Sequence, residues 1–532
     1  MRYDAVIIGA GHNGLACAAY LARSGLRVKL LERRGAIGGA AATEEFHPGF
    51  RNSVAAYTVS LLHPRIAREL RLAEHGLRVL ERPFANFLPL DERRYLKVGG
   101  GIDATRREFA RFSARDAERL PAYWAMLERV ADVLRDLVLE TPPNIGGGLA
   151  DVLRAVRAGR RLRRLDMEAR RDLVDLFAKS AADMLGRWFE SEPVSAAFAF
   201  DSIVGNYASP YHPGTAYVLL HHGFGEVNGK KGAWGHAVGG MGAVSEAIAL
   251  EARAHGAEIE VDAPVARVAV RGGRAVGVVL ADGREIDARA VIGGVNPKLL
   301  YLHMVEAGAL PPEFVERMRG WKCGSASFRM NVALDRLPRF ACLPGPGPHH
   351  SSGIVMGPSL DYMDRAYVDA RAHGIAHAPV IEMLIPSTLD STLVDEAHAR
   401  KGMHVASLFC QHFDPDADWA ARKGEAVMRI FDVIERFAPG FKSTVVAHTA
   451  LSPADLERDY GMLGGDIFHG RLSLDQLWSA RPMLGYADYR SPVKGLYLCG
   501  SGAHPGGGVT CAPGRNCARE VLNDFRRRLR AR

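Results

Sequence analysis

Near its start the chain reads Tyr3-Asp4-Ala5-Val6-Ile7-Ile8-Gly9-Ala10-Gly11-His12-Asn13-Gly14, and this stretch decides the fold. Residues 4–8 predict a short buried parallel strand, and the glycine-rich turn after it leads into an alanine-rich segment, 15–24, that predicts a helix. Gly25 ends that helix, and 26–31 predicts a second strand. Such a strand–helix–strand unit with short connections is typical of an α/β fold with a Rossmann-type domain.

The spacing of the glycines in this turn indicates a dinucleotide-binding site. Gly9 allows a tight turn, Gly11 lets the backbone approach a pyrophosphate, and Gly14 lets the helix pack against the strand. The helix start then directs N–H groups at the phosphates. Glu32 lies 18 residues after Gly14, where its carboxylate can accept hydrogen bonds from a ribose diol. An ordinary turn with a chance glutamate is the alternative, which the flanking strands and helix disfavour.

Three further glycine-rich segments predict backbone packed against a ligand. They are Gly35-Ala36-Ile37-Gly38-Gly39-Ala40-Ala41, then Gly239-Gly240-Met241-Gly242, and finally Cys499-Gly500-Ser501-Gly502-Ala503-His504-Pro505-Gly506-Gly507-Gly508-Val509. The last follows a predicted buried strand and precedes a helix that starts near Val509 or after Pro513. N–H groups at such a helix start stabilise negative charge. Flexible or purely structural glycine loops are the alternatives.

The order of the predicted elements indicates a discontinuous cofactor domain. Strand signals run from Ala263 to Gly294, with hairpin turns at Gly272-Gly273 and Asp282-Gly283, and return the chain to the first strand. Residues about 104–200 show helical spacing and predict a helical insertion that Pro142-Pro143 and Gly146-Gly147-Gly148 divide. We therefore assign two domains by sequence block: a cofactor domain of 1–85, 232–300 and 480–532, and a mixed-sheet substrate domain of 86–231 and 301–479 that includes the insertion.

Composition narrows the function classes. The formal net charge of +8 comes from 68 basic and 60 acidic residues, and its excess is local, so no nucleic-acid partner is expected. The seven cysteines contain no Cys-x-x-Cys pair, which argues against a redox dithiol and against a thiolate zinc site, and no His/Glu spacing suggests another metal. Reduced cysteines, no leader before Tyr3 and no apolar run long enough to span a bilayer favour a cytoplasmic protein.

Two arginine-rich segments carry the local charge excess. Leu153–Arg171 predicts an amphipathic helix, which could lie on an anionic membrane at its inner face and admit a lipid substrate. A solvated insertion helix is the alternative. The tail at 525–530 is expected to be a disordered terminus.

Histidines are the candidate catalytic acids or bases. His236 and His504 lie within or beside the glycine-rich segments. His221, His222 and His412 are further candidates. No acidic partner is evident in the sequence for His221, His222 or His236, so a polar loop role is the alternative for each of them.

The four glycine-rich motifs, in this order, resemble those of the phytoene desaturase-like branch of the FAD-dependent amine oxidase superfamily, over nearly the whole chain. The most specific match is Leu496–Asn516, and Tyr460–His469 and Arg481-Pro482 also resemble the desaturase pattern. The resemblance is greatest to the subgroup of pyridine nucleotide-disulphide oxidoreductase domain-containing protein 2 and its bacterial relatives, although the dithiol that this name suggests is absent.

This resemblance implies that the cofactor is FAD and assigns contacts to it. Asn13 lies in the first turn and is assigned to the FAD-binding residues together with its glycines. The implied contacts are Gly9, Gly11 and Gly14 with the pyrophosphate, Glu32 with the ribose, Arg33 with the adenosine half, Gly39 and Ala40 with the pyrophosphate, Val265 with adenine, Gly500 and Ser501 with the ribityl chain and pyrophosphate, and Gly508 and Val509 with the flavin ring. Several relatives carry an acidic residue in place of Ser501, which puts that contact in doubt.

The resemblance also implies a reaction. A hydride would leave a carbon of a hydrophobic isoprenoid or lipid-like substrate, which the protein must hold within about 3–3.5 Å of the acceptor. No strong side-chain acid or base is needed if the product is conjugated. An amine oxidase, a redox-neutral isomerase and a regulatory flavoprotein without turnover are the alternatives.

Overall fold

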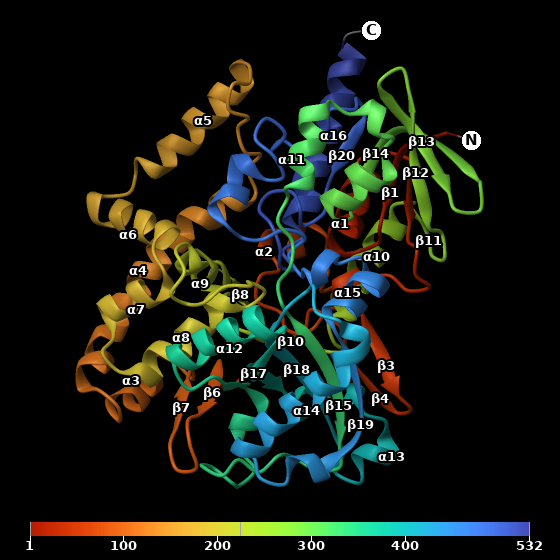
Figure 1. The fold of residues 1–532 in the computed structure, drawn as a ribbon. Helices are drawn as coiled ribbons and strands as arrows, with labels where there is room; N and C mark the ends of the chain where they lie inside the picture. The colour runs from red at the N-terminus through yellow and green to blue at the C-terminus, as the bar shows by residue number, and fades with distance from the viewer. Residues whose placement is uncertain (1, 224, 531–532) are drawn as a thin grey trace.

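The computed structural model describes residues 2–223 and 225–530 and arranges the helices around two main β-sheets (Figure 1). The first sheet lies at the upper right of Figure 1. Its strand order is β11 (Glu258–Glu260), β2 (Val28–Leu31), β1 (Tyr3–Ile8), β14 (Glu285–Gly293), β13 (Arg274–Leu280) and β12 (Val265–Arg271), with β20 (Leu496–Leu498) paired to β14.

Strand β1 lies at the centre of the first sheet because its apolar residues from Ala5 to Ile8 are buried. It pairs in parallel with β2 and with β14, where Val6 is opposite Val291. The two predicted hairpin turns join β12, β13 and β14 as antiparallel neighbours. The predicted return of the chain to the first strand is therefore confirmed. Carboxyl ends of parallel strands share one sheet edge, where ligands bind in open α/β sheets.

Helices α1 (His12–Arg23), α10 (Gly242–Ala254) and α16 (Ala512–Arg530) pack together beside this sheet, with α1 contacting both others. Small residues such as Ala18 and Ala19 are fully buried on α1 and allow this close approach. The predicted disorder of the tail is wrong, because α16 continues through 525–530. Phe525 is buried in the core, which anchors this part of the helix.

The second sheet lies in the lower half of Figure 1. Its strand order is β19 (Val445–Leu451), β15 (Phe328–Leu334), β18 (His404–Phe413), β17 (Ile375–Leu384), β16 (Gly353–Met356), β6 (Asn86–Pro89) and β7 (Tyr95–Val98). Its core is apolar, and Phe328, Ile381 and Leu408 are among its fully buried residues. The helices that accompany it are α12 (Leu360–His373), α13 (Glu396–Ala399) and α14 (Trp419–Phe437).

Short elements connect these layers. Two-stranded pairings join β3 (Thr43–His47) to β4 (Phe50–Ser53), β5 (Val79–Glu81) to β10 (Gly235–Ala237), and β8 (Glu226–Val227) to β9 (Lys230–Lys231). Short helices are α2 (Pro64–Glu69), α11 (Pro312–Arg319) and α15 (Pro453–Tyr460). The strands of the first sheet fall within 1–85, 232–300 and 480–532, and those of the second within 86–231 and 301–479. The domain boundaries themselves stay a prediction.

The predicted helical insertion is present and divides where the prolines and glycines indicated. Its helices are α3 (Ile102–Ala110), α4 (Ala114–Val138), α5 (Leu149–Leu162), α6 (Met167–Ala178), α7 (Ala181–Trp188), α8 (Glu192–Ile203) and α9 (Thr215–Gly223). The single helix expected over Leu153–Arg171 is wrong: α5 ends, and Asp166 caps α6 by accepting a hydrogen bond from the Ala169 N–H. No helix among residues 2–223 and 225–530 is long and apolar enough to cross a membrane.

Candidate functional site

The first glycine-rich turn has the geometry that its spacing predicts. Gly9 has a positive φ of 94°, and a Cβ on Gly14 would lie 2.1 Å from the Gly9 carbonyl oxygen. Both positions therefore require glycine. A Cβ on Gly11 would meet nothing within 4 Å, so space lies beside the start of α1. The helix has no side-chain cap and no acidic residue in its first turn, which leaves its N–H groups available to an anion.

The second glycine-rich segment packs against the first turn. The Gly38 N–H donates to the Ala10 carbonyl at 2.8 Å, and Gly38 has a φ of 111°. A Cβ on Gly39 would lie 3.3 Å from the Gly11 Cα. Segments near residues 10 and 39 therefore present backbone side by side, as expected for a pyrophosphate cradle.

The last glycine-rich segment meets the same turn from the far end of the chain. The Asn13 side-chain amide donates to the Ser501 hydroxyl at 3.1 Å. A Cβ on Gly500 would lie 2.9 Å from the Val295 carbonyl oxygen, and one on Gly514 would lie 2.1 Å from that of Asn13. The structure thus brings together the predicted residues of the first, second and last motifs.

Glu32 is buried at the end of β2, beside the turn. Its carboxylate accepts from the Ala10 N–H at 2.8 Å and from the Arg34 N–H at 3.0 Å. Each carboxylate oxygen retains a further acceptor position for a ribose hydroxyl. Val265 begins β12, and the Ala263 N–H donates to the Glu32 carbonyl at 2.8 Å, which brings the segment before Val265 alongside Glu32.

Arg33 is the predicted cofactor residue that lies apart from the turn. Its guanidinium is exposed and donates to the Arg458 carbonyl at 2.9 Å. The roles assigned to the individual cofactor-binding residues stay predictions.

Two buried polar atoms in the first turn lack a partner among the described residues: His12 Nε2 and Asn13 Oδ1. Burial lowers the pKa of His12 to about 4, although a hydrogen bond to the Gly508 backbone opposes this. Three features of this turn fit a dinucleotide that carries a flavin. Its polar atoms are neutral, the helix start has no acidic side chain, and its glycines leave space for a ligand. The residues present therefore fit FAD.

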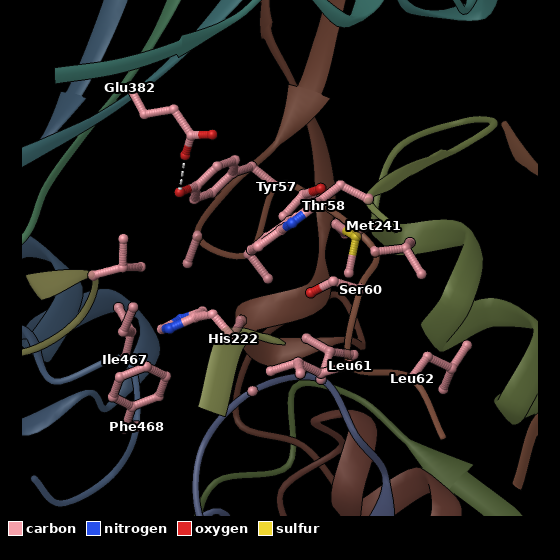
Figure 2. A pocket seen from close by; sticks show the side chains of 18 of the residues that line it. Tyr57, Thr58, Ser60, Leu61, Leu62, His222, Met241, Glu382, Ile467 and Phe468 are labelled. Atoms are coloured by element: carbon pink, nitrogen blue, oxygen red, sulfur yellow. Dashed lines mark hydrogen bonds between the residues drawn. The ribbon is translucent and has the colours of Figure 1, made fainter. Parts of the chain in front are cut away.

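A cavity adjoins this turn and extends between the two sheets (Figure 2). The space inside it that is open to the centre of a water-sized molecule is about 100 Å³. We call one side the turn wall, which consists of His12, Ala40, Met241, Gly508 and Val509. Most of the remaining lining is apolar and aromatic, including Leu61, Leu62, Phe200, Ile467 and Phe468.

A second part of the cavity lining carries polar and acidic side chains, and we call it the acidic wall: Tyr57, Asn86, Asp201 and Glu382. The Tyr57 hydroxyl donates to Glu382 at 2.5 Å, the dashed line in Figure 2. Burial and the neighbouring Glu382 raise the pKa of Asp201 to about 8. Burial also raises the pKa of Glu382, which Arg82 and Tyr57 oppose.

Sequence reasoning missed the acidic wall. A signal was present, because Asp201 and Glu382 are single acidic residues in apolar runs, Phe198-Ala199-Phe200-Asp201 and Val380-Ile381-Glu382-Met383-Leu384. Lone carboxyl groups in such runs are rarely buried without a function or a partner.

The candidate histidines do not lie on the turn wall. His236 is hydrogen-bonded to Asp390 at 2.9 Å, which corrects the expectation that it has no acidic partner. Asp390 also accepts from the Gly239 N–H at 2.7 Å, so the pair holds the third glycine-rich loop. Burial would raise the pKa of Asp390, but these hydrogen bonds outweigh burial and lower it to about 2.

His504 is buried, and its Nε2 lies 3.1 Å from the Leu137 carbonyl oxygen. Its ring packs against Trp478, and burial lowers its pKa to about 3. His222 lines the cavity, where burial lowers its pKa to about 4. Within the described chain, neither His236 nor His504 contributes to the cavity lining. His412 is buried within β18.

Arg481 fixes the loops that surround the turn wall. It is fully buried and donates to the carbonyl oxygens of Ser501, Phe468, Gly470, Arg471 and Gln476. Burial lowers its pKa to about 10, and Asp466 opposes this. The loop that presents Phe468 and the loop that presents Gly508 are thereby joined through one guanidinium.

A discontinuous dinucleotide cradle beside an interior cavity defines the protein as a flavin-dependent oxidoreductase. Residues 14–332 match the family model described as flavin containing amine oxidoreductase. The chain belongs to this family, and its cofactor is FAD.

Known proteins resemble the chain over nearly its full length. Pyridine nucleotide-disulfide oxidoreductase domain-containing protein 2 of Rattus norvegicus is 41% identical, covering 99% of this chain and 94% of its own. A lycopene-forming phytoene desaturase of Pseudescherichia vulneris is 27% identical and covers 95% of each chain. A redesigned putrescine oxidase has the same fold, with a TM-score of 0.61, 16% identity and 99% of each chain covered.

Proposed function

We propose that the protein removes hydride from a carbon of a hydrophobic, isoprenoid or lipid-like substrate. The observation that carries this proposal is the largely apolar cavity that begins at the turn wall. FAD, when bound, would supply the acceptor for the hydride, which carries both electrons, and the proton lost from the adjacent carbon would leave to a water molecule.

The chain's own residues would bind, orient and shield the substrate. Leu61, Ile467 and Phe468 line the cavity and exclude water from the reacting carbon. Near pH 7, His12 is neutral because burial lowers its pKa to about 4, so the turn wall offers no strong acid. A reaction that needs orientation more than proton transfer suits this wall. The likeness to phytoene desaturase supports the same reaction class.

The test is a substrate screen in which flavin absorbance is recorded without oxygen and peroxide is recorded under air. Isoprenoid or lipid-like compounds should bleach the flavin, and an added quinone or the admission of air should restore it. Bleaching by amines alone, with peroxide release, would replace this proposal with amine oxidation. If product forms only when the flavin is reduced beforehand and the substrate is not oxidised overall, the protein is an isomerase. If no compound gives a response, the protein is a regulatory flavoprotein.

We further propose that helix α5 docks on an anionic lipid surface and so delivers the substrate. This helix has no buried residue, and Figure 1 shows it extending from the body at the upper left. Leu149 and Leu153 are 83% and 63% exposed, and Val152 and Val156 lie on the same exposed stripe. Arg157, Arg160, Arg163 and Arg164 are also exposed and complement anionic headgroups.

Sedimentation with vesicles tests this contact. The protein should bind vesicles that contain phosphatidylglycerol and should not bind pure phosphatidylcholine. A Leu149→Asp/Leu153→Asp variant should lose binding, whereas Met428→Asp, at another exposed apolar position, should keep it. Equal binding by both variants would contradict the proposal.

A further inference from the structure

Asp201 is a carboxyl group without a partner inside the cavity. It lies near the C-terminal end of α8, is partly buried and lines the cavity. Among residues 2–223 and 225–530, no side chain or backbone group hydrogen-bonds or forms an ion pair with its carboxyl group. A polar group enclosed in this way is costly unless a ligand satisfies it.

The neighbouring acid of the same wall is already satisfied. Glu382 accepts from the Tyr57 hydroxyl at 2.5 Å and lies 4.0 Å from the Arg82 guanidinium. The Arg329 guanidinium lies 4.4 Å from the centre of the Tyr57 ring. Arg82 and Arg329 therefore balance Glu382 without help from a ligand, and Asp201 is the acid of this wall that remains available.

The environment of Asp201 decides which chemistry it can bind. Burial, the charge of Glu382 and the C-terminal end of α8 all disfavour the carboxylate, so the group carries a proton near neutral pH. A protonated carboxyl offers one donor and one acceptor. An anion here would be repelled by the charge of Glu382, and a cation would gain little from a protonated carboxyl group, so an uncharged polar group suits Asp201 best.

The acidic pair Glu382 and Tyr57 lies apart from the Gly508 part of the turn wall within the cavity. Figure 2 shows Glu382 and Tyr57 at one end and Leu61 and Leu62 at the other. A Cβ on Gly508 would lie 2.6 Å from Leu61 Cδ1, which places Gly508 at the Leu61 end. Asp201 lines the same cavity, near enough to Glu382 for that charge to raise the pKa of its carboxyl group.

We infer that the substrate is an oxygenated isoprenoid or lipid whose hydroxyl or carbonyl group hydrogen-bonds to Asp201, with its apolar chain extending toward the turn wall. This inference rests on the proposed function and sharpens its substrate class. Asp201 acts as a specificity-determining residue because a pure hydrocarbon leaves its carboxyl group unpaired.

The test measures binding, not turnover. Geraniol and the matching hydrocarbon 2,6-dimethylocta-2,6-diene are titrated into the FAD-loaded protein, and the change in flavin absorbance gives each Kd. Geraniol should bind about tenfold more tightly, as expected for one good hydrogen bond to a buried group. Geranylamine and geranic acid, which share the carbon skeleton, should both bind more weakly than geraniol.

Variants assign this preference to Asp201. Asp201→Ala should reduce the ratio of the two Kd values to about twofold or less, while Glu192→Ala, an exposed acid on the same helix, should leave it unchanged. Asp201→Asn retains a donor and an acceptor and should keep most of the preference, which guards against misfolding of the alanine variant.

The outcomes separate this inference from the proposed function. If both probes bind and the Asp201 variants leave their ratio unchanged, the inference fails while the apolar substrate stands. Tightest binding of geranylamine overturns the uncharged group in favour of a cation. If neither probe binds to any variant, the hydrophobic substrate is wrong and the inference fails with it.

Discussion

The turn wall and the acidic wall face the same cavity but are built from different parts of the polypeptide. The turn wall contains Gly508 and adjoins Gly11 and Gly39, where backbone lies beside the cofactor site and the space next to Gly11 is open. The acidic wall presents titratable side chains, above all Asp201 and Glu382. Backbone suits a large invariant cofactor, whereas side chains can be exchanged to select a substrate.

The two walls should therefore respond differently to substitution. Changes on the turn wall or its supports should affect folding or FAD binding. Changes on the acidic wall should affect substrate preference and the pH dependence of stability, and leave FAD bound.

The largest effect is expected from removing the support of the turn wall. Arg481→Met leaves several buried carbonyl oxygens without a donor, and each such loss costs about 1–3 kcal/mol, so the unfolding free energy should fall by at least about 3 kcal/mol. Chemical denaturation measures this loss. Arg481→Lys should recover only part of it, because an ammonium has three donors without the planar spread of a guanidinium. If the unfolding free energy of Arg481→Met equals that of wild type, the loops around the turn wall do not depend on this guanidinium.

A smaller loss is expected from crowding the turn itself. The Cβ of Gly14→Ala would lie 2.1 Å from the Gly9 carbonyl oxygen, so helix and strand must separate, at a cost of about 1–3 kcal/mol. Thermal unfolding monitored by circular dichroism measures it. Gly159→Ala is the matched control, since its Cβ meets nothing and alanine favours a helix. Equal melting temperatures for Gly14→Ala and wild type would contradict the packing argument.

Substitution of Asp201 in the acidic wall should instead change how the free energy of unfolding depends on pH. Folded Asp201 has a pKa of about 8 against an ordinary 3.8, so the folded protein holds a proton that the unfolded chain releases. Wild type therefore loses stability as pH rises from about 4 to 8. The stability of Asp201→Asn relative to wild type should rise between pH 5 and 8, by on the order of 2 kcal/mol.

The measurement is chemical denaturation of both proteins at pH 5, 6.5 and 8. Glu382 and Tyr123 interact electrostatically with Asp201 and are present in both proteins. Their own titration therefore largely cancels in the difference in stability between the two proteins. Glu192→Gln should show no such trend. A difference independent of pH would mean that Asp201 is ionised in the folded protein.

The same contrast explains what the sequence could predict. Turn geometry depends on residues close together in the chain, so the first strand and the roles of Gly9, Gly11 and Gly14 in the turn follow from the sequence alone. Each acid of the acidic wall stands alone in an apolar run, but that both line one cavity could not be predicted, because Asp201 and Glu382 are 181 residues apart and are brought to it only by the packing of the folded chain. The partner of His236 was missed for the same reason, since Asp390 comes from a distant loop.

Two predictions about single segments were wrong because short-range signals in the sequence were overlooked. The single helix expected over Leu153–Arg171 overlooked Asp166, whose cap begins a new helix. The arginines of the tail favour disorder, although Val521 and Phe525 are spaced to bury one helix face. In both places charge was given more weight than capping and periodicity.

The account depends most on the claim that backbone at Gly11 lies against FAD, and titration of the FAD-free protein with FAD tests it directly. Gly11→Ala introduces a Cβ that meets no protein atom within 4 Å, at an ordinary φ of −67°. The account predicts an unchanged melting temperature for the FAD-free variant and an FAD Kd raised about 100-fold, because the methyl group enters the space reserved for the pyrophosphate. An unchanged Kd would contradict it.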